Sequence, residues 1–149
     1  MCIRDRLSGI KPETKEIVVI LPDKSRASAE LHISDEDPET GLVEISIAFA
    51  GRELNQRGAD YFSTLVAIRE MLETENILLT CYGASRNIYP SPMSRSMGSG
   101  EKAYRLTLGQ PARSNDLVSI FDVGPDVEPA TVVEQAAFYQ KWLKSLAQS

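Results

Sequence analysis

The sequence predicts an α+β domain, in which an antiparallel sheet of about five strands carries one helix on a face and has a C-terminal helix packed against it. Segments with a period of two recur early in the chain, and the turns between them are too short for a parallel crossover. Apolar residues spaced three and four apart occur once in the middle of the chain and once near its end. The expected order of elements is β-β-β-α-β-loop-β-α.

The chain of 149 residues has the length of one domain. We expect residues 13–149 to form that domain and residues 1–12 to be a non-native or disordered leader, because residues 1–6 resemble the translated adaptor prefix that recurs in metagenomic assemblies. No apolar run approaches the roughly 18 residues of a membrane-spanning helix, and no secretory pattern is apparent. A cytoplasmic location away from membranes is therefore expected.

Three strands are expected before the first helix. Residues 16–21 form a β-branched apolar run that ends at Pro22 and Asp23, which favour a turn. Residues 27–33 alternate between apolar and polar side chains, so that His32 points outward. Residues 43–49 show the same alternation most clearly, after an acidic turn.

A helix is predicted over residues 59–73, with the Arg69 side chain off its apolar stripe. Residues 77–82 are apolar on both faces, which indicates an interior strand. Residues 103–108 alternate as a further strand, and if Leu106 points into the core, Arg105 lies on the opposite face. The stripe that should face the sheet consists of Tyr61, Leu65, Ile68 and Leu72.

Residues 117–121 fit a strand or a short helix equally well. Thr131 and Glu134 form a capping box, which predicts a terminal helix that ends near residue 146. The expected docking face of that helix consists of Ala136, Tyr139, Trp142, Leu143 and Leu146.

The loop over residues 83–102 is where a binding site is expected. It exceeds the length of about 12 to 15 residues above which loops in compact domains are uncommon and often functional. Five basic residues and one acidic residue lie between positions 82 and 113, although the whole chain has a net charge of −5. The sequence leaves open whether the peptide bonds before Pro90 and Pro92 are cis or trans.

Catalytic chemistry has little support in the sequence. Cys81 would need a histidine to become a nucleophile, and His32, the single histidine, is expected on another strand and facing outward. The segment Gly98-Ser99-Gly100-Glu101-Lys102 lacks the spacing of a phosphate-binding loop, and no dinucleotide-binding pattern follows a strand. With two cysteines in the chain, a cysteine-rich zinc site is excluded. No catalytic residue, metal or cofactor is therefore predicted.

Two binding functions rank ahead of an enzyme, which the sequence leaves open as the third hypothesis. The first is noncatalytic binding of a basic protein partner through acidic surface, as an inhibitor or immunity-type module would do. The alternative is a small anionic ligand that bears phosphate, held by arginine forks and aromatic rings of the loop. Nonspecific binding of nucleic acid is not expected of an acidic chain. The candidate partner-binding residues are Asp35, Glu36, Asp37, Asp122 and Asp126. The candidate ligand-binding residues are Tyr82, Ser85, Arg86, Asn87, Tyr89, Arg95 and Arg105.

Overall fold

The structure, a computed structural model, describes residues 13–92 and 100–147 of the chain. These residues form two antiparallel sheets and two α-helices, and the predicted α+β class with its five-stranded sheet is confirmed. The larger sheet has the order β4-β3-β2-β1-β5, from β1 (Glu13–Ile20), β2 (Arg26–Ile33), β3 (Val43–Phe49), β4 (Arg52–Gly58) and β5 (Leu78–Leu79). The smaller sheet has the order β6-β7-β8, from β6 (Ile88–Tyr89), β7 (Lys102–Arg105) and β8 (Leu117–Ser119).

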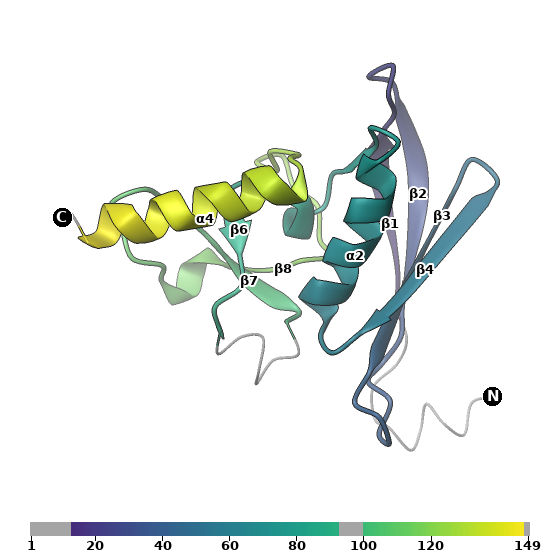
Figure 1. The fold of residues 1–149 in the computed structure, drawn as a ribbon, viewed down its shortest axis with the longest axis horizontal. Coiled ribbons are helices and arrows are strands. Elements are labelled where there is room, and N and C mark those ends of the chain that lie inside the picture. Colours follow the sequence, from purple (N-terminus) through teal and green to yellow (C-terminus); the bar gives the residue numbers. More distant parts are fainter. Residues whose placement is uncertain (1–12, 93–99, 148–149) are drawn as a thin grey trace.

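The two helices are α2 (Tyr61–Glu73) and α4 (Val132–Ala147). Helix α2 lies along the larger sheet. Helix α4 lies over the smaller sheet and extends away from the larger one (Figure 1). The Asp60 side chain caps α2 by accepting a hydrogen bond from the Ser63 backbone at 2.7 Å. Among the described residues, no helix is long and apolar enough to cross a membrane.

Strand β4 is the one strand of the larger sheet that the sequence did not predict. The strand contains a single apolar residue, Leu54. It has so little apolar character because it forms an edge of the sheet and none of its residues is fully buried. The turn that produces it is Ala50 followed by Gly51, both with positive φ, which matches the two-residue hairpin turn whose twist suits antiparallel strands. Strands β1 to β4 therefore form an uninterrupted meander.

The prediction of an interior strand over residues 77–82 is wrong. Only β5 is a strand there, and it lies at the other edge of the sheet, paired with β1 alone. The run is apolar because later parts of the chain cover it: the Tyr82 amide donates to the Asp122 carbonyl and the Gly83 amide to the Ile120 carbonyl, both at 2.8 Å. A side chain at Gly83 would not fit, since a Cβ there would lie 2.6 Å from the Leu65 Cδ2 atom.

The strand expected over residues 103–108 belongs to the smaller sheet rather than the larger. It ends at Arg105, and its predicted alternation holds only in part: Leu106 is buried as expected, but Ala103 is buried too and Leu108 is 40% exposed. Residues 117–121, which the sequence left undecided, begin with strand β8, which pairs with β7. The Tyr89–Pro90 and Ser91–Pro92 bonds are trans.

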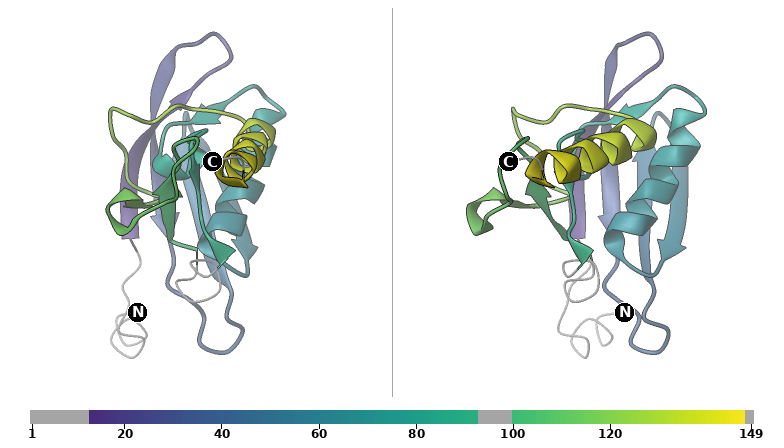
Figure 2. Two further views of the ribbon diagram at one scale, coloured as in Figure 1. Left: turned by 90° about the vertical axis from the view of Figure 1, so that its left-hand side faces the viewer. Right: turned by 60° about the vertical axis from the view of Figure 1, so that its left-hand side comes forward.

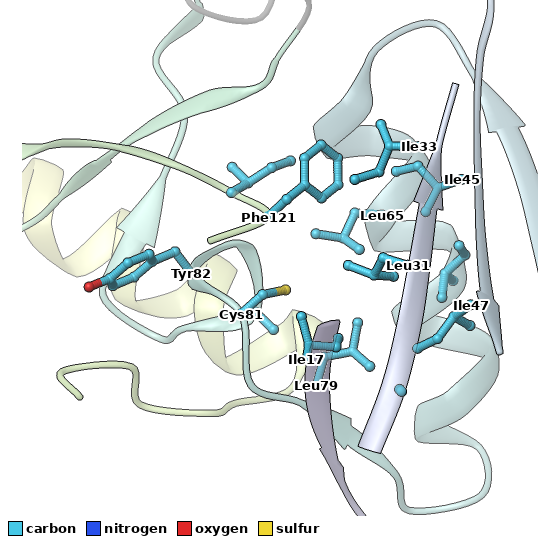
Figure 3. Close-up of a cluster of buried hydrophobic side chains, with 14 of the residues drawn as sticks. Ile17, Leu31, Ile33, Ile45, Ile47, Leu65, Leu79, Cys81, Tyr82 and Phe121 are labelled. Carbon is cyan, nitrogen blue, oxygen red and sulfur yellow. The ribbon is translucent and has the colours of Figure 1, made fainter. Parts of the chain in front are cut away.

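The main core lies between the larger sheet and α2. Leu31 and Ile45 from the sheet face Leu65 from the helix, and Phe121 and the Cys81 side chain extend the cluster toward the smaller sheet (Figure 3). Burial of each such Leu or Ile side chain stabilises the fold by about 1.5 to 3 kcal/mol.

A buried polar cluster joins α2 to the C-terminal half of the chain. The Arg69 side chain is only 2% exposed, so the prediction that it lies off the packed stripe is wrong. Its guanidinium donates to the Gly83 carbonyl at 3.0 Å, to the Ala130 carbonyl at 3.0 Å and to Gln135 Oε1 at 2.6 Å. The Gln135 amide in turn donates to carbonyls of Gly83, Ser85 and Ile88. Burial lowers the pKa of Arg69.

Helix α4 begins with the predicted capping box. The Thr131 hydroxyl accepts from the Glu134 amide at 3.1 Å, and the Glu134 carboxylate accepts from the Thr131 amide at 2.9 Å. Trp142 is buried as expected and donates to the Gln110 carbonyl, whereas Leu143 is 39% exposed and does not belong to the docking face. Gln135, which the sequence did not indicate, lies in the first turn of the helix and is buried together with Trp142.

Candidate binding surfaces

The described part of the predicted binding loop is attached to the rest of the protein through its own polar groups. Ser85 is fully buried, and its hydroxyl donates to Asn87 Oδ1 at 2.8 Å while it accepts from the Glu128 amide at 2.9 Å. Arg86 forms an ion pair with the Glu128 carboxylate at 2.9 Å and lies over the Phe138 ring. These side chains hold the loop against the segment that precedes α4.

Tyr89 contributes to helix packing. Its ring stacks on Tyr139 of α4 with 4.2 Å between centroids, and its other neighbour is the Phe62 ring of α2 at 5.2 Å. The predicted ligand-binding residue Arg95 lies outside the described residues.

Tyr82 and Arg105 come together in a network with Asp126. The Tyr82 hydroxyl donates to Asp126 Oδ1 at 2.6 Å and accepts from Arg105 Nη2 at 3.1 Å, while Arg105 Nε donates to Asp126 Oδ2 at 2.8 Å. These hydrogen bonds, from Tyr82 first and Arg105 second, hold the pKa of Asp126 below its usual range. A candidate ligand-binding arginine and a candidate partner-binding aspartate therefore neutralise each other.

A surface hollow of about 500 Å³ lies beside this network. The Tyr82 ring points away from the main core, with its hydroxyl outward (Figure 3). The hollow is also lined by Arg105, by the carboxylates of Glu16 and Asp122, and by two cations that the sequence did not place there, Lys15 of β1 and Lys102 of β7. Lys15 is paired with Asp122, another candidate partner-binding residue, at 3.0 Å, and this hydrogen bond raises the pKa of Lys15. The sequence could not predict that these side chains come together, because Lys15, Tyr82 and Arg105 belong to segments that are far apart in the chain.

The acidic turn between β2 and β3 lines a second hollow of about 500 Å³. Asp35 is 5% exposed and so offers little of its carboxylate to a partner, whereas Glu36 and Asp37 are exposed. One Asp37 oxygen accepts a hydrogen bond from the Glu39 amide at 2.8 Å, which shapes the turn.

A further acidic surface emerges from the strand register. Glu16 of β1 lies directly opposite Glu30 of β2, Glu30 lies opposite Ala48 of β3, and Ala48 lies opposite Glu53 of β4. We call Glu16, Glu30 and Glu53 the acidic row. All three are exposed and stand on the face of the larger sheet that is turned away from α2. The sequence shows that Glu30 points outward, but the alignment of the strands is a property of the fold.

Cys81 is fully buried and its sulfur points into the core (Figure 3). Burial raises the pKa of its thiol to about 11, which disfavours the nucleophilic thiolate. The position fits a structural cysteine.

The chain matches no protein family model, and a comparison with curated proteins gives no match.

Proposed function

We propose that this chain is a noncatalytic binding protein that recognises a basic protein partner through acidic surface, as an inhibitor or immunity-type protein does. The observation that carries the proposal is the difference between its two charged surfaces. The described loop arginine Arg86 and the strand arginine Arg105 are engaged by Glu128 and Asp126. The acidic row and the turn acids Glu36 and Glu39 are exposed to solvent.

Exposed acidic side chains suit recognition of a cationic protein. Complementary charge accelerates encounter and rejects partners of the wrong sign, and it does so without a preformed pocket. The net charge of −5 adds a long-range attraction for a basic partner. Asp122 and Asp126, the other acids of the predicted surface, are tied to Lys15 and Arg105 and contribute less of this field.

Peptide selection tests this function without knowledge of the natural partner. The folded protein is immobilised, a random peptide library displayed on phage is selected against it, and the enriched peptides are synthesised. We expect the enriched peptides to be rich in lysine and arginine, and their affinity in titration calorimetry to fall steeply with added salt. Enrichment of neutral or acidic peptides, or binding that salt leaves unchanged, would contradict the proposal.

One observation favours the second candidate, a small anionic ligand. Tyr82 and Arg105 of the predicted ligand set line the same hollow as Lys15 and Lys102. The ion pairs in that hollow are partly exposed, and such pairs contribute only about 0 to 1 kcal/mol, so a phosphate could displace the carboxylates at little cost. Thermal unfolding with inorganic phosphate, nucleotides and sugar phosphates tests this candidate: a rise in Tm that Arg105→Gln abolishes would support it, and no rise with any compound would reject it.

A further inference from the structure

We propose that the partner docks on the outer face of the larger sheet, centred on the acidic row, and that the docked surface is a lysine- or arginine-bearing segment that crosses the strands. This inference rests on the proposed function and assigns it a place on the molecule. None of the acids chosen from the sequence, at positions 35, 36, 37, 122 and 126, belongs to this face.

The outer face is open except at its β1 edge, where residues 123–129 and outward side chains of β1 and β2, Glu16 among them, line one hollow. The helices α2 and α4 and the smaller sheet lie on the other side of the larger sheet, as Figure 1 and Figure 2 show. Every outward position of β1 to β4 is exposed or half-buried, and the buried residues of β1 to β3 all stand at the alternate positions. The outward positions near the centre include the small side chains of Ser28, Ser46 and Ala48, beside the larger Val18, His32 and Asn55. None of these outward side chains is buried, so the face is accessible to a partner surface.

The strand register concentrates negative charge at the middle of this face. Glu16 and Glu30 are direct cross-strand partners, and adjacent strands are about 4.8 Å apart, so the two carboxylates are neighbours. Glu53 lies two strands beyond Glu30, or roughly 10 Å away, with only the methyl group of Ala48 between them. A row of cationic side chains laid across the strands would meet all three.

The cations of this face stand mostly away from the acidic row. Arg26 pairs in register with Ile20 at one end of the β1–β2 ladder, and Arg57 lies 3.7 Å from Glu44 toward the opposite end. Within the central rows of the described strands, the group that contacts the acidic row is His32, at 3.1 Å from Glu30. The centre of the face is therefore acidic and complements a basic partner.

Repulsion within the acidic row also lowers the stability of the protein when no partner is bound. Like charges directly opposite one another on an antiparallel pair are destabilising, and a lysine at either position would convert repulsion into attraction. Local rules of this kind are most often broken at functional sites, where another requirement outweighs stability. Binding of a cation between Glu16 and Glu30 would relieve the repulsion, which links the arrangement to a basic ligand.

The substitution Glu30→Lys separates a binding role from a structural one. If the row binds the partner, the variant loses affinity for the selected basic peptides by about tenfold or more, a factor that corresponds to 1.4 kcal/mol. Its Tm should rise by roughly 1 to 4 °C, because the pairing of the introduced ammonium group with the Glu16 carboxylate should outweigh the loss of the exposed Glu30–His32 contact. If Glu30 instead stabilises the fold, Glu30→Lys should lower the Tm.

The matched control is Glu70→Lys, which makes the same charge change at an exposed position of α2, on the other side of the sheet. We expect it to change peptide affinity by less than about threefold, the size of a long-range effect screened by salt. Equal losses in Glu30→Lys and Glu70→Lys would overturn the inference, since only net charge would then matter.

A third variant, Glu36→Lys with Glu39→Lys, distinguishes the two proposals. Loss of peptide binding in this turn variant but not in Glu30→Lys would overturn the docking face while the proposed function stands. If the wild-type protein selects no basic peptides at all, the proposed function fails, and the docking face fails with it.

Discussion

Arg69 shows how much of this fold depends on one side chain. Its three hydrogen bonds satisfy carbonyls from Gly83 and Ala130 and the amide oxygen of Gln135, all inside the protein. Loss of the guanidinium removes the donor from the buried Ala130 carbonyl and from the Gln135 amide oxygen, while the Gly83 carbonyl still accepts from the Gln135 amide.

We predict that Arg69→Met lowers the free energy of unfolding by about 3 kcal/mol or more, since each unsatisfied buried polar group costs about 1 to 3 kcal/mol. Urea denaturation followed by circular dichroism measures this difference. The control is Glu70→Ala, the exposed neighbour on the same helix, for which a change within about 0.5 kcal/mol is expected. A similar loss in both variants would show that helix propensity, rather than the buried cluster, determines the result.

The sequence could not reveal the role of Arg69, although it predicted the face of α2 that packs on the sheet. A helical stripe is visible when one face is apolar, and Leu65, Ile68 and Leu72 form that face. The partners of Arg69 are backbone carbonyls and an amide side chain, which carry no hydrophobic signal and lie up to 66 residues away. Gln135 was missed for the same reason.

At the scale of elements, the capping box of α4 was readable because its two residues are three positions apart. We predict that Thr131→Ala destabilises the protein by about 1 kcal/mol, the usual cost of losing an N-cap hydroxyl. Urea denaturation again provides the measurement, and Thr107→Ala in an exposed loop is the control. An unchanged midpoint in Thr131→Ala would mean that the contacts of Trp142 and Gln135 alone fix the helix.

Elements with a strong apolar period were predicted, and those without one were not. Strands β1 to β3 and both helices follow from the sequence, because their buried positions repeat regularly. Strand β4 has a polar edge sequence, and the strand predicted over residues 77–82 owes its apolar character to coverage by the segment around Ile120. The existence of a second sheet depends on β6 and β8, which are two and three residues long and too short for any period.

At the scale of the whole molecule, the sequence predicted which charged residues are at the surface but not which of them form ion pairs with one another. The sequence identified Arg86, Arg105 and Asp126 as charged and surface-exposed, yet it assigned them to two different functions. The structure brings Arg105 to Asp126 and Arg86 to Glu128, because the segment before α4 returns to the loop after β5. Ion pairs between segments that are distant in the chain depend on the tertiary structure, so counts of charged residues cannot predict them.

The ion network at Asp126 makes a prediction about acid stability. The folded-state pKa of Asp126 is lowered, so its contribution to stability is present above the unfolded pKa, near 3.8, and is lost as the pH falls through the folded value. Wild-type protein should therefore be more stable than Asp126→Asn at pH 6, and the difference should shrink by pH 3. Urea midpoints at the two pH values measure it, and a difference that grows on acidification would contradict this account.

The distance in sequence between Arg69 and Gln135 also orders events during synthesis on the ribosome. The meander of β1 to β4 and the helix α2 emerge first, and each pairs with a neighbour already made. Arg69 then stays in contact with water until Ala130 and Gln135 have been translated. A nascent chain without α4 consequently keeps the Arg69 side of α2 hydrated, and the two halves of the molecule can close on one another only after that helix appears.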